Sequence, residues 1–388
     1  MEKVTPFDFQ TAGRILFGSG VVARLPQLAH DYGKRIFLIG GVVSSILDEV
    51  VAGLKAEGMT VVQRAVREEP TLNGILAFAE EARKIDSQVI VGLGGGSALD
   101  AAKATAALTV NPGDPLDYLE VIGKGLPLRV DPLPVIAIPT TAGTGSEVTR
   151  NAVLGIPERK VKVSLRSPKM LPVIALVDAE LTLSLSAELT ASTGMDALTQ
   201  LIEPYVSNRA NALTDQFCEA GIQCSVRSLR AAYRDGNNLT AREELSFASL
   251  MGGLALANAG LGAAHGFAAP IGGLFGAPHG AVCARLLPAV CRANIRAIQK
   301  QDTAQRILDR YTQVAVWLTG RHNAIPFDGA EWLDELCAEI NIPPLREYGI
   351  QHGDFAWLIE NAAKASSMKA NPVILAPDEL AQILEDAW

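Results

Sequence analysis

The sequence predicts an α/β domain with a mainly parallel sheet in the first half of the chain and an all-helical domain in the second half. Short apolar runs rich in β-branched residues, such as residues 35–39 and 89–93, alternate with stretches of helical periodicity. Such alternation is typical of right-handed crossovers that place helices on both faces of a parallel sheet. From about Leu181 onward the pattern is helical almost throughout. We therefore expect two domains, residues 1–180 and 181–388.

The elements of the first domain follow one another along the chain. Residues 7–24 are expected to form a strand, a turn at Gly18–Gly20 and the start of a helix. Each further strand is short and apolar, as strands buried on both faces are. These strands are expected at residues 35–39, 60–66, 89–93, 135–138 and 173–177, with helices over residues 44–57 and 72–85 and from Ala98.

The composition limits the kind of partner that the chain binds. The 388 residues are 48% hydrophobic, enough for two ordinary cores, and carry a net charge of −8 without a basic block. These values argue against nucleic acid or an anionic membrane surface and favour a small-molecule ligand. Residues 245–284 contain no Lys, Arg, Asp or Glu, but their prolines, glycines and two histidines favour a soluble core over a membrane span.

The N-terminal segment and the cysteines indicate a cytoplasmic protein. The segment MEKVTPFDFQTAGRI lacks the apolar core of a signal peptide and carries acidic residues. The five cysteines form no close CxxC pair, and their number is odd. We expect them to be reduced and packed as small hydrophobic residues.

Residues 88–104 combine an apolar strand, a glycine turn and a helical segment. Gly94, Gly95 and Gly96 allow backbone amides to approach a ligand without interference from a Cβ atom. We expect Ser97 to cap the following helix, so that free amides and the positive end of the helix dipole meet at one point, which suits a phosphate. The alternative is a tight strand-to-helix connection without a ligand.

A second glycine-rich turn, PTTAGTGSEVT, lies at residues 139–149. Its hydroxyl-bearing side chains before Glu147 are interleaved with glycines, and such a loop can surround a carboxamide, a ribose or a phosphate. The alternative is a turn whose hydroxyl groups satisfy only its own backbone. The four side chains are those of Thr140, Thr141, Thr144 and Ser146.

In the helical half, four polar side chains are candidates for a metal site. Asp196 and Gln200 lie four residues apart and therefore on one face of the expected helix. His265 and His279, each beside a glycine, lie in the stretch without charged residues. A buried carboxylate and two imidazoles need charge compensation, which a divalent cation supplies. Taken singly, each histidine is more often a hydrogen-bonded core residue, so the spacing alone leaves both interpretations open.

Several long motifs occur in an order that resembles the iron-containing, metal-dependent alcohol dehydrogenase family, which is related to dehydroquinate synthase and glycerol dehydrogenase. The motifs are GGGSALDAAKA, PTTAGTGSEVT, LPVIALVDAELT, GMDALTQLIEPYVS and HGFAAPIGGLFGAPHG, and the similarity extends from about Phe7 through the C-terminal helices. The resemblance implies a dehydroquinate synthase-like fold, with an N-terminal Rossmann-like domain for NAD(P) and a helical domain for a divalent metal.

The resemblance also implies roles for individual residues of the first domain. The turn at Gly94–Ser97 corresponds to the one that holds the pyrophosphate in this family, and the turn at Thr140–Ser146 to the one that surrounds the nicotinamide and its ribose. Lys162 falls where the family has a lysine near the nicotinamide ribose. The cofactor-binding residues so implied are Gly41, Gly94, Gly95, Gly96, Ser97, Asp100, Thr140, Thr141, Thr144, Ser146 and Lys162.

Asp196, His265 and His279 match three of the family's four metal ligands and, with Lys162, form the implied catalytic set. The fourth position, usually histidine, is Gln200. An amide oxygen is a weaker and harder ligand than imidazole, so we expect lowered affinity for Fe²⁺ or Zn²⁺, with Mn²⁺ and Mg²⁺ less disfavoured. Fe²⁺ remains the first expectation for the metal, with Zn²⁺ or Mn²⁺ as alternatives.

Two further positions depart from the family pattern. A histidine that serves as a proton relay in many members is Ala269 here. The aspartate that accepts a hydrogen bond from the adenosine 2′-hydroxyl is Gly41, and its absence removes repulsion toward a 2′-phosphate, to which Ser44 or Ser45 could donate. We therefore expect NADPH to be accepted or preferred.

The expected activity is that of an NAD(P)-dependent, metal-dependent alcohol dehydrogenase or aldehyde reductase, in which hydride moves between nicotinamide C4 and a small alcohol or carbonyl compound. A homodimer is expected from the resemblance of the N-terminal strand to one that pairs between subunits. Two alternatives remain open: a metal-free enzyme similar to maleylacetate reductase, and a catalytically silent nucleotide-binding protein.

Overall fold

The computed structural model describes residues 6–41, 45–120, 122–159, 161–300 and 305–388. The chain forms two compact units. The first, here called the sheet unit, consists of residues 10–141 and 145–184. The second, here called the helical unit, consists of residues 185–388 together with residues 142–144 and the N-terminal segment up to Phe9.

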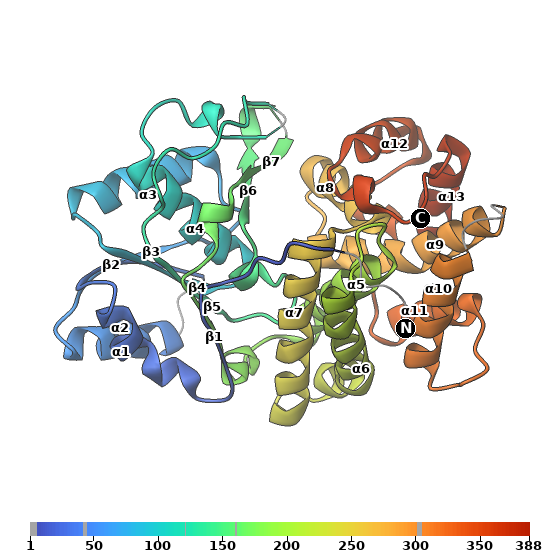
Figure 1. The fold of residues 1–388 in the computed structure, drawn as a ribbon, viewed down its shortest axis with the longest axis horizontal. Helices are drawn as coiled ribbons and strands as arrows, with labels where there is room; N and C mark the ends of the chain where they lie inside the picture. Colours follow the sequence, from blue (N-terminus) through green and yellow to red (C-terminus); the bar gives the residue numbers. More distant parts are fainter. Residues whose placement is uncertain (1–5, 42–44, 121, 160, 301–304) are drawn as a thin grey trace. The chain divides into compact units, whose positions relative to one another are not determined.

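The sheet unit is built on six strands in the order β1-β8-β5-β4-β2-β3, and every neighbouring pair is parallel (Figure 1). This order confirms the predicted α/β class. The strand expected within residues 7–24 is limited to three residues. The strands are β1 (Ile15–Phe17), β2 (Arg35–Gly40), β3 (Thr60–Ala65), β4 (Val89–Gly94), β5 (Val135–Pro139) and β8 (Ile174–Val177).

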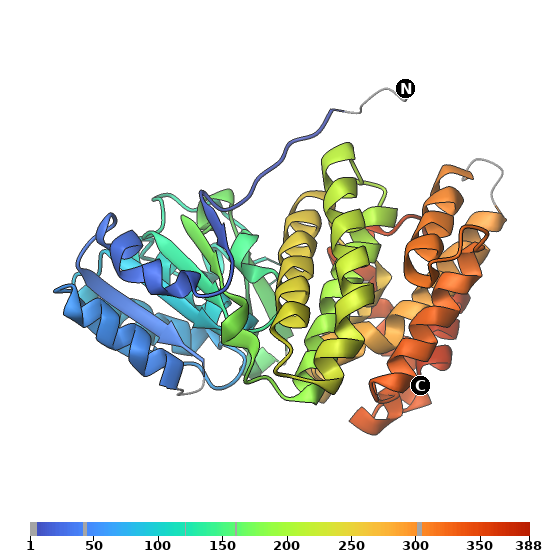
Figure 2. The same ribbon diagram turned by 90° about the horizontal axis from the view of Figure 1, so that it is seen from below.

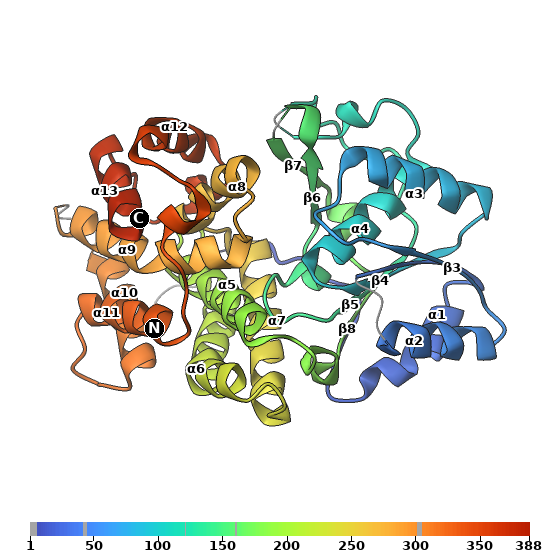
Figure 3. The same ribbon diagram turned by 180° about the vertical axis from the view of Figure 1, so that it is seen from behind.

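Helices cover both faces of this sheet, as Figure 3 shows from behind. Successive side chains of a strand point to opposite faces, so Ile36 and Leu38 of β2 pack with the residues of α1 and α2, whereas Phe37 and Ile39 pack with those of α3 and α4. Both faces are therefore buried, which explains the apolar strand sequences. The helices are α1 (Leu25–His30), α2 (Ser45–Ala56), α3 (Leu72–Lys84) and α4 (Gly96–Val110).

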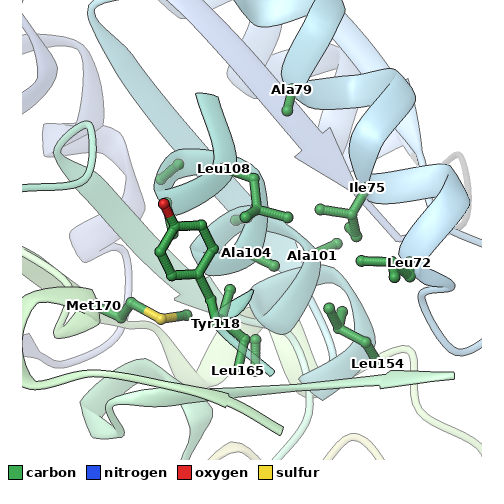
Figure 4. Close-up of a cluster of buried hydrophobic side chains, with 14 of the residues drawn as sticks. Leu72, Ile75, Ala79, Ala101, Ala104, Leu108, Tyr118, Leu154, Leu165 and Met170 are labelled. Carbon is green, nitrogen blue, oxygen red and sulfur yellow. The ribbon is translucent and has the colours of Figure 1, made fainter. Parts of the chain in front are cut away.

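An antiparallel hairpin, β6 (Asn151–Ile156) and β7 (Val161–Arg166), lies against the same side as α3 and α4. Leu154 and Leu165 of the hairpin are fully buried in a cluster with Leu72 and Ile75 of α3 (Figure 4). The sequence analysis did not predict these strands. Their alternation of buried and more exposed residues marks a sheet with one covered face, unlike the continuous apolar runs of the main sheet.

The helical unit contains the remaining helices, and Figure 2 shows α5, α6 and α7 as neighbours. Helix α9 packs against α5, α8, α11 and α13 and so lies at the centre of this unit. The helices are α5 (Ala187–Val206), α6 (Ala212–Arg234), α7 (Leu239–Ala259), α8 (Ala263–Phe275), α9 (His279–Gln299), α10 (Gln305–Thr319), α11 (Pro326–Glu339), α12 (Phe355–Lys364) and α13 (Pro377–Ala387).

The stretch without charged residues forms most of α7, all of α8 and the start of α9. Among the described residues, no helix taken singly has the length and apolar composition that crossing a membrane requires. Helices α7 and α8 together, bent by 100°, meet that criterion by length and composition alone. The large majority of α7 and α8 residues from 245 to 272 are buried, because the small side chains let these helices pack closely.

Candidate metal centre and dinucleotide turn

Four side chains from three helices of the helical unit converge on one point. Asp196 lies on α5, His265 on α8, and His279 and Cys283 on the first turns of α9. One ligand atom from each lies within 4.8 Å of the others. Oδ1 of Asp196 is 3.5 Å from Nε2 of His265 and 3.9 Å from Nε2 of His279. The structure thus brings together three of the four residues proposed from the sequence as metal ligands, and the fourth, Gln200, contacts Asp196.

The polar atoms at this point fit a divalent cation. Oδ1 of Asp196, Nε2 of His265 and Oε1 of Gln200 are buried and have no hydrogen-bond partner among the described residues. A buried polar atom without a hydrogen-bond partner ordinarily lowers the stability of the fold by about 1–3 kcal/mol. A cation that accepts their lone pairs removes this cost, and the donor set of carboxylate, imidazole and amide oxygen suits a transition metal.

A buried carboxylate fixes the orientation of His265. Oε2 of Glu203 lies 2.7 Å from Nδ1 of His265, and the same side chain accepts hydrogen bonds from the backbone amides of Gly262 at 2.9 Å and Ala264 at 2.7 Å. Glu203 therefore satisfies the N-terminal amides of α8 and assigns the ring proton to Nδ1, leaving the Nε2 lone pair directed toward Asp196. The sequence analysis missed this residue, although it follows Asp196 by seven residues, on the same face of α5.

Gln200 contacts the carboxylate of the site directly. Its Nε2 donates to Oδ2 of Asp196 at 2.9 Å, and the Gln200 side chain is buried. The amide therefore orients Asp196 and leaves the other carboxylate oxygen, Oδ1, for the site. The expectation that Gln200 Oε1 is itself a metal ligand stays a prediction.

Cys283 belongs to the cluster, although the sequence analysis treated all five cysteines as small hydrophobic residues. All five are free thiols, as expected. Sγ of Cys283 is 3.7 Å from Nε2 of His279, one helical turn away, and the residue is fully buried. The signal that could have found it is its spacing of four residues from His279 within α9.

Electrostatics at the cluster favour positive charge. Burial opposes ionisation of Asp196, yet the nearby imidazoles of His265 and His279 hold its pKa below the ordinary value. Burial likewise opposes protonation of His265, but Cys283 and Glu203 raise its pKa well above the ordinary value. Cys283 also raises the pKa of His279, whose side chain is 44% exposed. The groups around the two imidazoles therefore stabilise positive charge at this point, which a bound cation would supply.

In the sheet unit, the glycine turn joins β4 to the N-terminus of α4. The helix begins at Gly96 with Gly95 as its N-cap, so the amides of Gly96 and Ser97 have no acceptor within the helix. Ser97 lies inside the first turn, and the expectation that it caps the helix is therefore wrong. A Cβ atom on Gly94 would lie 2.7 Å from Cβ of Ala98 and 3.0 Å from the Gly41 nitrogen. Gly94 therefore has no room for a side chain between Ala98 and the backbone of Gly41.

The ends of three neighbouring strands meet at this turn. Gly41, after β2, donates its amide to Leu93 O at 2.9 Å, and Thr140, after β5, donates its amide to Gly94 O at 3.0 Å. Thr141 lies close to Gly95, where an added Cβ would be 3.3 Å from its Cγ2. The carboxyl ends of adjacent parallel strands are where α/β sheets bind ligands. Ser44 and the side chain of Ser45 lie outside the described residues.

Two of the residues proposed to contact the cofactor, Ser146 and Asp100, are hydrogen-bonded to each other. Ser146 donates its Oγ hydrogen to Oδ1 of Asp100 at 2.6 Å, while Oδ2 of Asp100 accepts from the amide of Val153 at 2.9 Å. The buried ammonium group of Lys103 is 3.2 Å from Oδ1 of Asp100. Asp100 thus ties α4 to the second turn and to β6. A cofactor contact for either residue stays a prediction.

The remaining proposed residues are placed as follows. Thr144 belongs to the three-residue segment of the turn that groups with the helical unit. Lys162 lies on β7, where its Nζ is 2.6 Å from Oε1 of Glu69. Their contacts with a cofactor stay predictions.

Comparisons with known proteins agree with this fold. Residues 12–179 match the family of iron-containing alcohol dehydrogenases, and residues 190–388 match the C-terminal domain of the same family. The chain is 33% identical to 1,3-propanediol dehydrogenase of Citrobacter freundii, over 98% of this chain and 99% of that protein. It is 35% identical to alcohol dehydrogenase 4 of Saccharomyces cerevisiae, over all of both chains.

Solved structures lead to the same class. The crystal structure of a 1,3-propanediol oxidoreductase superposes with a TM-score of 0.90 at 32% identity, over 99% of this chain and 100% of that one. A parallel-sheet unit with a glycine turn and a helical unit with a metal donor set define a metal-dependent dehydrogenase. The chain belongs to the iron-containing alcohol dehydrogenase family, and it is an oxidoreductase that acts on CH–OH groups.

Proposed function

We propose that this alcohol dehydrogenase works chiefly as a reductase of small aldehydes or ketones, with NAD(P)H as hydride donor and a divalent metal held by Asp196, His265 and His279. The observation that carries the proposal is the set of buried lone-pair atoms that face one another without partners. The reducing cytosol expected for the chain favours carbonyl reduction.

The protein's own residues prepare the site in three ways. Asp196 supplies negative charge, and its hydrogen bond from Gln200 fixes which oxygen faces the site. Glu203 holds His265 in the tautomer whose Nε2 carries a lone pair. When bound, the metal supplies Lewis acidity that stabilises alkoxide character on the substrate oxygen. The side chains of the site are thus oriented before the substrate binds, which lowers the entropic cost of reaching the reactive geometry.

The dinucleotide is proposed to bind at the N-terminus of α4. Unpaired amides and the helix dipole favour the pyrophosphate there, and Gly94–Gly96 present no side chain against it. Chemistry at the nicotinamide belongs to the cofactor, whereas the turn fixes its position.

NADPH is proposed to be accepted, because Gly41 places no carboxylate after β2. The test is kcat/KM for NADPH and for NADH with one aldehyde. Comparable or higher values with NADPH are expected. A tenfold or greater preference for NADH would overturn this choice of cofactor without affecting the proposed metal chemistry.

Proton transfer must follow a different route from that expected in relatives with a relay histidine. Ala269 lies one helical turn after His265 on α8 and is exposed. The proton is therefore proposed to come from water or from ribose hydroxyl groups.

The proposed function is tested with protein purified without added metal, by elemental analysis together with a panel of short aldehydes. About one divalent metal per chain and cofactor oxidation that stops with chelator are expected. Turnover that is insensitive to chelator would favour a metal-free reductase, and no turnover by the fully metal-loaded protein would favour a nucleotide-binding protein without catalysis.

A homodimer is also proposed, supported by the edge position of β1 in the sheet, where backbone groups can pair with a second chain. Sedimentation analysis tests it, and a monomer at micromolar concentration would contradict it. A cytoplasmic location remains a proposal, supported by the five free thiols.

A further inference from the structure

We propose that Cys283 supplies the fourth protein ligand of the metal, in place of the histidine that Gln200 replaces. The site then consists of one carboxylate, two imidazoles and one thiolate, from Asp196, His265, His279 and Cys283. This inference rests on the proposed metal dependence and adds to it a ligand and a preference for a softer metal.

Three of the separations between ligand atoms in the cluster are close to those of a tetrahedral site. Typical metal–ligand distances of about 2.0–2.3 Å place neighbouring nitrogen and oxygen ligands about 3.4 Å apart, and a nitrogen and a sulfur about 3.6 Å apart. The corresponding separations here are 3.5 Å for His265 and Asp196, 3.9 Å for His279 and Asp196, and 3.7 Å for Cys283 and His279. All four ligand atoms lie within 4.8 Å of one another.

The burial of the cluster supports the same assignment. Cys283 is fully buried, and the two unpartnered atoms beside it, Oδ1 of Asp196 and Nε2 of His265, belong to side chains that are about 2–5% exposed. A cation at this point gives these buried ligand atoms a common partner.

Gln200 has a different task in this arrangement. Its Nε2 donates to Oδ2 of Asp196, so the side chain already orients a ligand. Its free atom is a neutral amide oxygen, which competes poorly with a thiolate for a transition metal. The amide therefore acts as a positioning residue, and the sulfur takes the fourth place.

A sulfur ligand changes the preferred metal. On binding, the Cys283 thiol loses its proton to solvent and the sulfur bonds the metal as thiolate, with no change of oxidation state. Thiolate favours Zn²⁺ over Mn²⁺ and Mg²⁺ more strongly than oxygen or nitrogen ligands do. This chain is therefore expected to select zinc, rather than the oxygen-tolerant hard ions that Gln200 alone suggests.

The test uses the full-length apoprotein loaded with Co²⁺, which gives a thiolate-to-metal charge-transfer band in the near ultraviolet when sulfur is a ligand. The variants are Cys283→Ala and Cys283→Ser, with Cys291→Ala as the matched control, because Cys291 is a buried thiol on the same helix outside the cluster. Bound cobalt per chain is measured in parallel, and Zn²⁺ and Mn²⁺ affinities are measured by competition with a chelator.

One Co²⁺ per chain with a charge-transfer band is expected for the wild type and Cys291→Ala, and no band for either Cys283 variant. Zn²⁺ affinity should fall by more than about tenfold in Cys283→Ala, because the loss of a partner that only orients a ligand already costs about tenfold. Mn²⁺ affinity should change less. Because the band is measured in the wild type, sulfur ligation can be tested even if a variant misfolds. One bound Co²⁺ per chain without the charge-transfer band would show that Cys283 is not a ligand, and it would still support the proposed metal dependence. Failure of the wild type to retain any metal would overturn both proposals.

Discussion

Glu203 and His265 lie 62 residues apart in the sequence, yet Oε2 of the glutamate is 2.7 Å from Nδ1 of the imidazole. The same carboxylate accepts two backbone amides at the start of α8, so one side chain sets both the helix terminus and the histidine tautomer. The metal centre therefore depends on a residue that never has to touch the metal.

Replacing Glu203 by glutamine should weaken metal binding. The glutamine side chain has one acceptor oxygen instead of two. It therefore cannot accept hydrogen bonds from His265 Nδ1 and from both backbone N–H groups, as the carboxylate does. Removing such a partner typically lowers metal affinity by about 10–100-fold. Titration of the apoprotein with Zn²⁺ against a chelator measures the change. Glu188→Gln, an exposed glutamate near the start of the same helix, is the control, and equal affinities in the two variants would refute the role of Glu203.

A methyl group on Gly94 should impair cofactor binding and leave the metal in place. The added Cβ would meet Ala98 and the Gly41 nitrogen at 2.7 and 3.0 Å. Relief of these contacts displaces the backbone amides of the turn from the pyrophosphate, and a loss of about 1.4 kcal/mol of binding free energy corresponds to tenfold in affinity. We expect Gly94→Ala to raise KM for NAD(P)H about tenfold or more, with unchanged metal content. The control is Gly53→Ala on α2, whose Cβ would make an ordinary contact of 3.6 Å. A KM equal to that of the control would argue against binding at this turn.

Glu147 should make the stability of the sheet unit depend on pH. Burial raises its pKa from 4.5 to about 7, against the opposing charge of Lys103, which is paired with Asp100. Between these two pH values the folded chain holds a proton that the unfolded chain releases, so the free energy of unfolding falls as pH rises through this window. The free energy of unfolding falls by about 3 kcal/mol across this window, because the pKa differs by about 2.5 between the folded and unfolded chain and each pKa unit corresponds to about 1.36 kcal/mol.

Glu147→Gln removes this dependence, because the amide stays neutral. Urea unfolding followed by far-ultraviolet circular dichroism should show the variant gaining stability relative to the wild type between pH 5 and pH 8. Glu57→Gln, an exposed residue of the same unit, should show no such gain. Parallel pH profiles for Glu147→Gln and the wild type would contradict the assignment of a protonated Glu147.

The main sheet was predictable because its strands are buried on both faces. After Arg35, the runs at β2 and β4 contain no polar residue, and their short length, β-branched residues and terminal glycines identify them as strands buried on both faces. The hairpin of β6 and β7 was missed because strands such as VKVSLR alternate apolar and polar residues, and such short runs give a weak signal. The capping role expected of Ser97 failed because the glycine before the helix can itself take the N-cap position.

The metal centre was predictable only in part. Asp196, His265 and His279 stand out as polar residues in motifs or in uncharged surroundings, and the structure brings them together. Glu203 and Cys283 stand out less, because a glutamate in a helix and a cysteine among apolar residues are ordinary, and only their spacing from Asp196 and His279 connects them with the site. Their roles arise from the packing of α5, α8 and α9, which a single sequence does not specify.

The most direct test of the whole account is the metal content and turnover of Asp196→Ala beside the wild type. The substitution removes the ligand that faces both imidazoles. We predict about one divalent metal per wild-type chain, and loss of both the metal and aldehyde reduction in the variant, with NAD(P)H binding retained. A variant that contains no metal and still reduces aldehydes at the wild-type rate would contradict the account.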